Sequence, residues 1–151
     1  MVREKNGAYG VMAGLNRGNG QIYMTSYRDP QIMETLNAYQ NAGKALLAEI
    51  SSGSLLESDI ATAIIGTIGS IDGSAPSPAQ VGWITMMRWI YGSNAENRQR
   101  LRNQILNTSR EDFVYFATRL THYWRLPSVA IVASESAIND APELDLYLLK
   151  N

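Results

Sequence analysis

The sequence predicts an α+β fold of the α/β-roll type, in which a small antiparallel sheet packs against about five helices. Strand-forming segments open the chain at 8–15 and 21–27, and a continuous apolar run follows at 129–134. Across 29–124, apolar residues recur at the three-to-four-residue spacing of helices. A chain of 151 residues, 45% hydrophobic and 18% charged, has the size and composition of one globular domain. We therefore expect residues 1–151 to form a single unit.

The first expected element is a β-hairpin. Segments 8–15 and 21–27 are rich in Tyr, Val, Met, Ile and Thr, and the polar residues 16–20 between them are typical of a turn. Glycine-rich loops also bind phosphate. The stretch 14–21 contains neither G-x-G-x-x-G nor G-K-[ST], however, so we interpret its glycines as turn residues.

Five helices are expected after the hairpin. Asp29 and Pro30 favour a helix start, and one apolar face then continues to Ile50. That face comprises Ile32, Leu36, Tyr39, Gly43, Leu46, Leu47 and Ile50. The later starts are Ser54-x-x-Glu57, Ser77-Pro78, Asn94, and the overlapping pair Thr108-x-x-Glu111 and Ser109-x-x-Asp112, whose helix should reach Trp124.

Two glycines inside the helical region and a proline after it add to this prediction. Gly66 and Gly69 each cost about 1 kcal/mol against alanine inside a helix, so they indicate close backbone packing against a neighbour. Pro127 blocks continuation of the fifth helix, and the run 129–134 is typical of a strand buried on both faces. The expected sheet is therefore the hairpin plus one late strand, which is barely enough for independent stability.

Composition and motifs exclude several chemistries. The absence of cysteine excludes disulfides, thiolate metal sites and a cysteine nucleophile. The only histidine, His122, has no H-x-x-E-H or H-E-x-x-H partners, so no metal site is expected in this chain. Without a G-x-S-x-G elbow, His122 is a packing or surface residue rather than part of a triad. No apolar run could span a membrane, and no secretory signal opens the chain.

An arginine-rich stretch leaves one alternative open. Residues 88–125 carry seven Lys/Arg and three Asp/Glu, a sum of +4. Such a cluster could bind nucleic acid through phosphate contacts. We favour a solvated helix face or an internal docking surface, because the pI is about 5.8 and no RNA-binding signature is present.

Three separated motifs carry a family resemblance. They are VREKNGAYG at 2–10, TSYRDP at 25–30 and AIIGTIGSID at 63–72. In this order they closely resemble the C-terminal part of the presequence protease group, within the pitrilysin or insulinase-like superfamily of inverted zinc metallopeptidases. Members of that group show R-E-K-G-G-A-Y-G, S-Y-R-D-P and A-I-I-G-T-I-G-D. The resemblance covers roughly 2–120 and fades after Pro127.

The resemblance implies an architecture and a metal. In such proteases two homologous halves, each of two α/β domains, close around a chamber, and zinc is held by H-x-x-E-H in the amino-terminal half. This chain resembles the C-terminal part of the fourth and last domain. We therefore expect a fragment whose parent is a zinc metalloendopeptidase degrading unstructured peptides, with zinc bound outside this chain and none here. Alone, the fragment should be inactive.

The resemblance also assigns site residues. Arg3 and Tyr9 match the arginine and tyrosine that reach the substrate peptide across the closed chamber. Arg3 would grip substrate carbonyls with its fixed, forked charge, and the Tyr9 phenol would donate to the oxyanion. Gly7 and Gly10 would let the backbone approach the substrate beside Tyr9. The expected catalytic pair is thus Tyr9 and Arg3, and the expected substrate-binding set adds Gly7 and Gly10.

Other positions in these motifs are interpreted differently. Tyr27, Arg28 and Asp29 are expected to form a structural strand end and helix cap. Asn6 stands where the group has glycine, which is a mild change because asparagine tolerates left-handed backbone. Residues 11–12, Val-Met, replace a glycine-rich continuation and alter the expected shape of the substrate groove.

Partners and alternatives follow from the same resemblance. The expected partners are a peptide substrate and the remaining domains of the parent protease, with self-association of the fragment through its unpaired strand edge, and with neither nucleic acid nor membrane. The expected compartment is the mitochondrial matrix or plastid in a eukaryote and the cytoplasm in a bacterium. The alternatives are a non-catalytic structural subunit of the same superfamily and an arginine-rich nucleic-acid-binding module.

Overall fold

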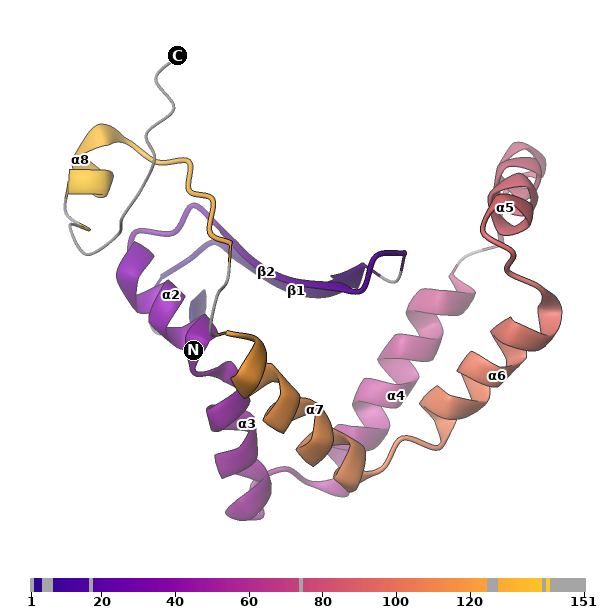
Figure 1. Ribbon diagram of the computed structural model, residues 1–151, viewed down its shortest axis with the longest axis horizontal. Helices are drawn as coiled ribbons and strands as arrows, with labels where there is room; N and C mark the ends of the chain where they lie inside the picture. The colour runs from indigo at the N-terminus through magenta and orange to yellow at the C-terminus, as the bar shows by residue number, and fades with distance from the viewer. Residues whose placement is uncertain are drawn as a thin grey trace. The chain divides into compact units, whose positions relative to one another are not determined.

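The structure, a computed structural model, describes residues 2–3, 7–16, 18–73, 75–124, 128–139 and 141. These residues contain two strands, β1 (Gly10–Asn16) and β2 (Gln21–Tyr27), and seven helices. The helices are α2 (Ile32–Gln40), α3 (Ala42–Ser51), α4 (Glu57–Asp72), α5 (Pro78–Ile90), α6 (Ala95–Leu106), α7 (Arg110–Tyr123) and α8 (Glu135–Asn139) (Figure 1). The predicted α+β class is confirmed.

The chain divides into two compact units. Met1–Ala45 and Ala117–Asn151 form one, called here the hairpin unit, and Leu46–Phe116 form the other, called the helical unit. Within the described ranges, every helix is too short or too polar to cross a lipid bilayer.

The predicted β-hairpin is confirmed. β1 and β2 pair antiparallel, with Gly10 opposite Tyr27 at the open end and Asn16 opposite Gln21 at the turn. At the turn, the Asn16 carbonyl accepts from the Gly20 N–H at 2.8 Å, and Gly20 has a φ of +74°. This left-handed conformation explains why glycine occupies the end of the turn.

A small core supports the hairpin. Val2, Ala8 and Tyr39 are buried together, and Met24 of β2 packs against them. Ala38 and Trp124 are partly buried against the same cluster. The core therefore joins the chain start, one strand, α2 and the end of α7.

The single helix predicted from Asp29 to Ile50 is wrong, because it is two helices. The break falls at Asn41, whose backbone N–H and side-chain Nδ2 both donate to the Asn37 carbonyl, at 3.0 and 2.9 Å. An asparagine side chain that competes for a backbone acceptor favours a helix end. The apolar spacing continues across this break, so periodicity alone did not reveal it.

The predicted helix starts of the helical unit are mostly confirmed. Ser77 and Gln80 form a reciprocal capping box at α5, and Asn94 Oδ1 accepts from Asn97 N–H at 2.7 Å at α6. At α7, Asp112 Oδ2 accepts from the Ser109 N–H at 2.9 Å.

The predicted start of α4 is displaced. The cap position is Leu56 rather than Ser54, and the Asp59 carboxylate accepts from the Leu56 N–H at 2.9 Å. The expected close packing at Gly66 and Gly69 is wrong among the described residues, because a Cβ at either position would meet nothing within 4 Å. α4 lies beside α6, and Arg102 forms an ion pair with Asp72 (Figure 1).

The predicted late strand is also wrong. Residues 128–134 have no assigned strand pairing, and among the described residues the sheet consists of β1 and β2 alone. Val132 is fully exposed, whereas the apolar run predicted burial on both faces. The segment is extended and apolar, as expected, but the described chain provides no strand for it to pair with.

Candidate functional site

Tyr9 lies at the entrance to β1, where its backbone is fixed and its side chain is free. Its N–H is shared between the carbonyls of Tyr27, at 3.1 Å, and Arg28, at 3.4 Å. Its side chain is 70% exposed. The backbone is thus held against the end of β2 while the phenol faces solvent, an arrangement that could present a hydrogen-bond donor to a ligand.

The two candidate glycines beside Tyr9 differ in what they require. Gly7 has a φ of +76°, a conformation that side chains disfavour, so glycine is needed there for the backbone path into β1. Gly10 has an ordinary strand backbone, and a Cβ there would lie 3.8 Å from Tyr27 Cβ, an ordinary contact. The described structure could therefore accommodate a residue with a side chain at position 10.

The sequence predicted only a structural place for Arg28 at the strand end and did not predict its contact with Tyr9. Its guanidinium carbon lies 5.9 Å from the ring centre of Tyr9 and 5.5 Å from that of Tyr27, within cation–π range of both. The two rings meet edge to face, with centroids 6.1 Å apart and an interplanar angle of 78°. We call these three side chains the Tyr9 cluster. It brings together the first and second of the three sequence motifs.

Arg28 has the only left-handed backbone among the described non-glycine residues, with a φ of +48°. This conformation turns the chain from β2 toward α2. Asp29 follows, and its Oδ1 accepts from the Gln31 N–H at 2.9 Å just before the helix begins. The prediction of a strand end at Tyr27 and Arg28 fits this geometry. The prediction of Asp29 as the helix cap is wrong, because the cap position is Gln31 and, among the described residues, no side chain caps α2. Arg28 also contacts Tyr9. Tyr9 and Arg28 belong to two separate motifs, and a single sequence does not show that these motifs lie side by side.

Arg3 lies at the same end of the hairpin as Tyr9. Val2 is buried, and its carbonyl accepts from the Ala8 N–H at 3.5 Å, so the two candidate residues flank one backbone contact. The Arg3 side chain is exposed. Residues 4–6, which complete the R-E-K-N-G motif and include the departure at Asn6, lie outside the described residues.

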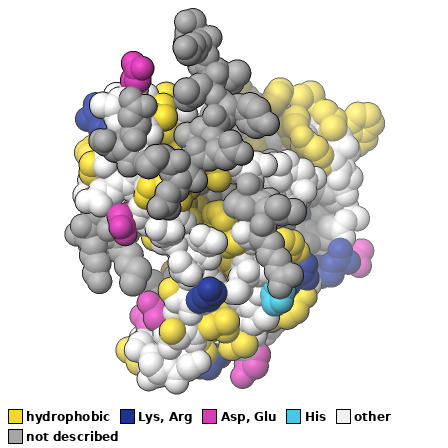
Figure 2. All heavy atoms as spheres, turned by 60° about the vertical axis from the view of Figure 1, so that its left-hand side comes forward, with side chains coloured by type: hydrophobic (Ala, Val, Ile, Leu, Met, Phe, Trp, Pro, Cys, Tyr) yellow, Lys and Arg dark blue, Asp and Glu magenta, His cyan; other side chains and the backbone are white. Residues whose placement is uncertain are grey.

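Among the described residues, no set of side chains is gathered in a way suited to zinc. The chain has one histidine and no cysteine, and the described residues contain no cluster of three or more His, Cys, Asp or Glu side chains suited to a metal. His122 is exposed, as the cyan side chain in Figure 2 shows, and its Nδ1 lies 2.8 Å from the Thr118 carbonyl. That contact places the proton on Nδ1 and makes His122 part of its own helix surface.

Several arginines of the basic stretch bind within the helical unit. Arg102 pairs with Asp72, and Arg110 donates to Glu57 at 3.0 Å and to the Leu55 carbonyl at 2.7 Å. Arg98 donates to the Ser93 carbonyl at 2.8 Å and Arg100 to Asn97 Oδ1 at 2.9 Å. Four of the seven arginines of the basic stretch thus bond to groups within this unit.

Comparison with known proteins defines the class. A family model described as "PreP C-terminal domain" matches residues 1–135. The match extends past Pro127, so the similarity does not fade where the motifs alone had suggested. This chain belongs to the PreP C-terminal domain family, and the expected presequence protease relationship is confirmed.

Individual relatives agree with the family. "Presequence protease 1, chloroplastic/mitochondrial" of Arabidopsis thaliana is 38% identical over 117 residues, which cover 77% of this chain and 10% of that protein. "Presequence protease, mitochondrial" of Drosophila melanogaster is 31% identical over 131 residues, covering 82% and 12%. "Protein HypA" of Clostridium perfringens is 31% identical over 143 residues, covering 95% and 14%. The chain thus spans 10 to 14% of the length of these relatives.

Proposed function

We propose that this chain is the substrate-gripping, chamber-closing C-terminal portion of a zinc oligopeptidase that degrades unstructured peptides. It would form the C-terminal part of the fourth domain, with zinc held by the rest of the protein. The family membership supports the proposal that the longer protein is a peptidase. The main observation behind the proposed site is that the Tyr9 phenol is exposed while its backbone is held by hydrogen bonds.

In this proposal Tyr9 acts through its hydroxyl. A peptide carbonyl that is attacked by water becomes an oxyanion, and a preorganised O–H donor stabilises that charge as it develops. The two carbonyls that share the Tyr9 N–H hold the backbone in place. The Arg28 guanidinium over the Tyr9 ring restricts its orientation, so less freedom is lost when substrate binds.

Arg3 has a different part in the proposal. Its guanidinium is charged at every physiological pH and donates through a planar fork, so it would hold substrate carbonyls before and during the reaction. Gly7, with its left-handed backbone, leaves room for a peptide beside Tyr9, and Gly10 extends that approach.

The test uses the complete protease with Tyr9→Phe. The variant keeps the ring contacts with Arg28 and Tyr27 but removes the donor, so kcat should fall by on the order of 10²–10³ on an unstructured peptide. Tyr23→Phe is a matched control, since Tyr23 lies in β2 outside the Tyr9 cluster. A Tyr9→Phe enzyme that keeps the parent rate would refute the role of Tyr9. A complete parent that shows no peptidase activity would instead support the structural-subunit alternative.

The isolated chain should be inactive. Its one histidine is not part of an H-x-x-E-H or H-E-x-x-H pattern, so the chain should neither bind zinc stoichiometrically nor hydrolyse peptides. Chelator-sensitive hydrolysis by the pure 151-residue chain would contradict this. For location, we propose the mitochondrial matrix or plastid if the source is eukaryotic and the cytoplasm if it is bacterial.

A further inference from the structure

The backbone at Arg28 would suit glycine better than arginine. Its φ of +48° is in the left-handed region, which glycine adopts without strain. The guanidinium contacts with the rings of Tyr9 and Tyr27 are at the surface, and two exposed cation–π contacts contribute about as much as the left-handed backbone costs. Stability therefore does not explain why the turn contains arginine. This strain, at a residue beside the candidate site, indicates a function for the arginine side chain.

The Arg28 guanidinium has no anionic partner within the described part of the chain. Its side chain is exposed, and none of the hydrogen bonds or ion pairs among the described residues uses its N–H groups. The arginines that do form ion pairs, Arg102 with Asp72 and Arg110 with Glu57, lie in the helical unit. An arginine side chain carries five N–H donors and a permanent positive charge. Those of Arg28 are thus available to a ligand.

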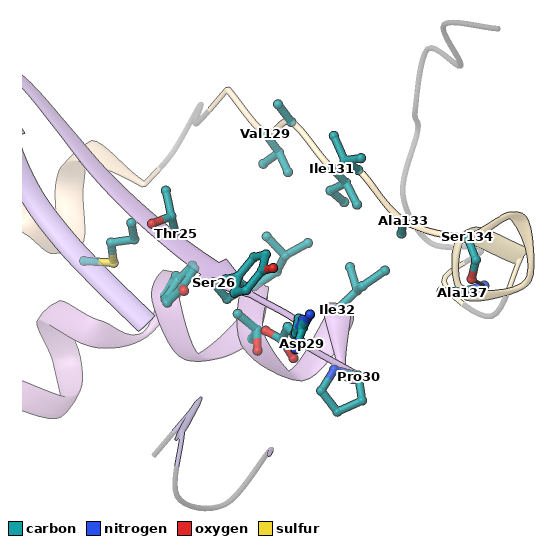
Figure 3. Close-up of a pocket in the computed structure, with 18 of the residues that line it drawn as sticks. Thr25, Ser26, Asp29, Pro30, Ile32, Val129, Ile131, Ala133, Ser134 and Ala137 are labelled. Carbon is teal, nitrogen blue, oxygen red and sulfur yellow. Dashed lines mark hydrogen bonds between the residues drawn. The ribbon is translucent and has the colours of Figure 1, made fainter. Parts of the chain in front are cut away.

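The neighbouring carboxylate, that of Asp29, does not pair with Arg28. Asp29 Oδ1 accepts from the Gln31 N–H at 2.9 Å, and Asp29 Oδ2 is buried without a hydrogen-bond partner among the described residues. Asp29 is one of the residues that line a hollow of about 810 Å³ in the hairpin unit, as Figure 3 shows. The acid next to Arg28 in the sequence is therefore engaged on the protein side, and the guanidinium keeps its charge for a partner in solvent.

Arg28 also lies close to the group that carries the proposed chemistry. Its guanidinium carbon is 5.9 Å from the centre of the Tyr9 ring, and the hydroxyl on that ring is the proposed oxyanion donor. An extended peptide advances about 3.3–3.6 Å per residue. When the scissile carbonyl meets the Tyr9 hydroxyl, a substrate residue within about two positions of that carbonyl would therefore be in reach of Arg28.

We propose that Arg28 is a specificity-determining residue, which binds a carboxylate of the peptide substrate close to the scissile bond. A guanidinium holds a carboxylate through two parallel charge-assisted hydrogen bonds, which a neutral side chain cannot form. The carboxylate belongs either to an Asp or Glu side chain or to the free C-terminus of the peptide. This inference rests on the proposed function, because the Tyr9 hydroxyl is what places the scissile carbonyl beside Arg28.

The experiment compares matched peptides as substrates of the complete protease. The parent peptide is unstructured and has a single cleavage site, mapped by mass spectrometry. One set of pairs carries Glu or Gln at each position next to the scissile bond and at the following position on either side. A further pair ends shortly after that bond, as a free acid or as an amide. We expect kcat/KM to favour the carboxylate member of at least one pair by about fivefold, the upper range for an exposed ion pair.

Variants of Arg28 assign that preference to its charge. Arg28→Gln removes the charge but keeps an unbranched side chain, so the preference should disappear, whereas Arg28→Lys should retain part of it. Arg119→Gln is the matched control, since the Arg119 guanidinium lies 5.4 Å from the ring centre of Tyr123 on α7, outside the Tyr9 cluster, and it should leave the preference unchanged. A variant that only repositions Tyr9 would change both members of a pair by the same factor, so the ratio isolates contact with the carboxylate.

Two results would overturn the proposal. One is a parent enzyme that shows no carboxylate preference in any pair, and the other is a preference that Arg28→Gln leaves intact. Loss of a Glu over Gln preference identifies a substrate side chain as the ligand, and loss of an acid over amide preference identifies the peptide C-terminus.

The proposed function is judged by a separate measurement, the rate of Tyr9→Phe on the neutral peptides, which offer Arg28 no carboxylate. A parental rate there, together with a preference that Arg28→Gln abolishes, would refute the oxyanion role and leave the carboxylate contact standing. A slow Tyr9→Phe enzyme with no carboxylate preference in the parent would do the reverse. A complete protein without peptidase activity would overturn both.

Discussion

Gly43 lies directly against Thr121, so close that α3 and α7 meet backbone to backbone. A Cβ at Gly43 would lie 2.5 Å from Thr121 Oγ1, 2.8 Å from the Thr121 amide nitrogen and 2.7 Å from the Ala117 carbonyl oxygen. Two of these atoms belong to backbone and cannot rotate away. The contact fixes how these helices cross within the hairpin unit.

Gly43→Ala should therefore destabilise the chain by about 1–3 kcal/mol, because overpacking outweighs the gain in helix propensity. Gly66→Ala is the matched control, since a Cβ there meets nothing within 4 Å, and it should stabilise by up to about 1 kcal/mol. Urea denaturation followed by circular dichroism measures both. Changes of the same sign in the two variants would contradict the close approach at Gly43.

The Asp72–Arg102 pair should make the stability of the helical unit depend on pH. The Arg102 hydrogen bond lowers the pKa of Asp72 below its ordinary 3.8. A lowered carboxyl pKa contributes stability that is present above the ordinary value and is lost as pH falls through the folded value. Asp72→Asn should thus lower the Tm near neutral pH and match the parent in strong acid.

Salt gives an independent check on this pair. Both side chains are largely exposed, so added salt should shrink the neutral-pH difference in Tm between parent and Asp72→Asn. A difference in Tm that persists in strong acid would show that the asparagine acts through the end of α4 and not through lost charge.

Arg3→Ala in the complete protease should differ from Tyr9→Phe in its kinetic pattern. A guanidinium that grips substrate carbonyls acts in the ground state and in the transition state, so KM should rise as kcat falls. Steady-state kinetics on an unstructured peptide would measure both constants. An Arg3→Ala enzyme with parental KM would exclude ground-state binding by this side chain.

Arg28 can be tested by separating its backbone from its side chain. Arg28→Gly keeps the left-handed turn and removes the guanidinium, so the chain should stay folded while the ring-proton resonances of Tyr9 and Tyr27 shift. Arg28→Val places a branched side chain in a conformation it disfavours and should cost about 1–2 kcal/mol. Unchanged ring resonances in the glycine variant would argue against a positioning role.

The sequence predicted the features that depend on neighbouring residues. Ser77 and Asn94 cap their helices as expected, because an N-cap bonds to an amide only three positions away. The hairpin was predictable for the same reason, since its strands are joined by a short polar turn.

The errors arose where distant segments decide the outcome. Residues 129–134 have the composition of a buried strand, but forming one requires a partner that the described chain does not supply. The contact of Arg28 with Tyr9 joins the residue after β2 to the residue before β1, so no local pattern indicated it. Gly43 and Gly66 both stand inside apolar helical patterns, yet among the described residues a Cβ would contact another helix at Gly43 and nothing within 4 Å at Gly66.

The hairpin has one further consequence for Tyr9. Most side chains of β1 and β2 are exposed on both faces, and Met24 is the β2 side chain that packs against the core, so little buried surface opposes a shift of one strand along the other. The pairing is instead held by its ends, at the Asn16 to Gly20 turn and at the Tyr9 N–H. A shift of a single residue would carry Tyr9 away from Arg28 and reverse the face it presents. The chemistry of the polar turn at the far end of the hairpin therefore decides where the Tyr9 phenol points.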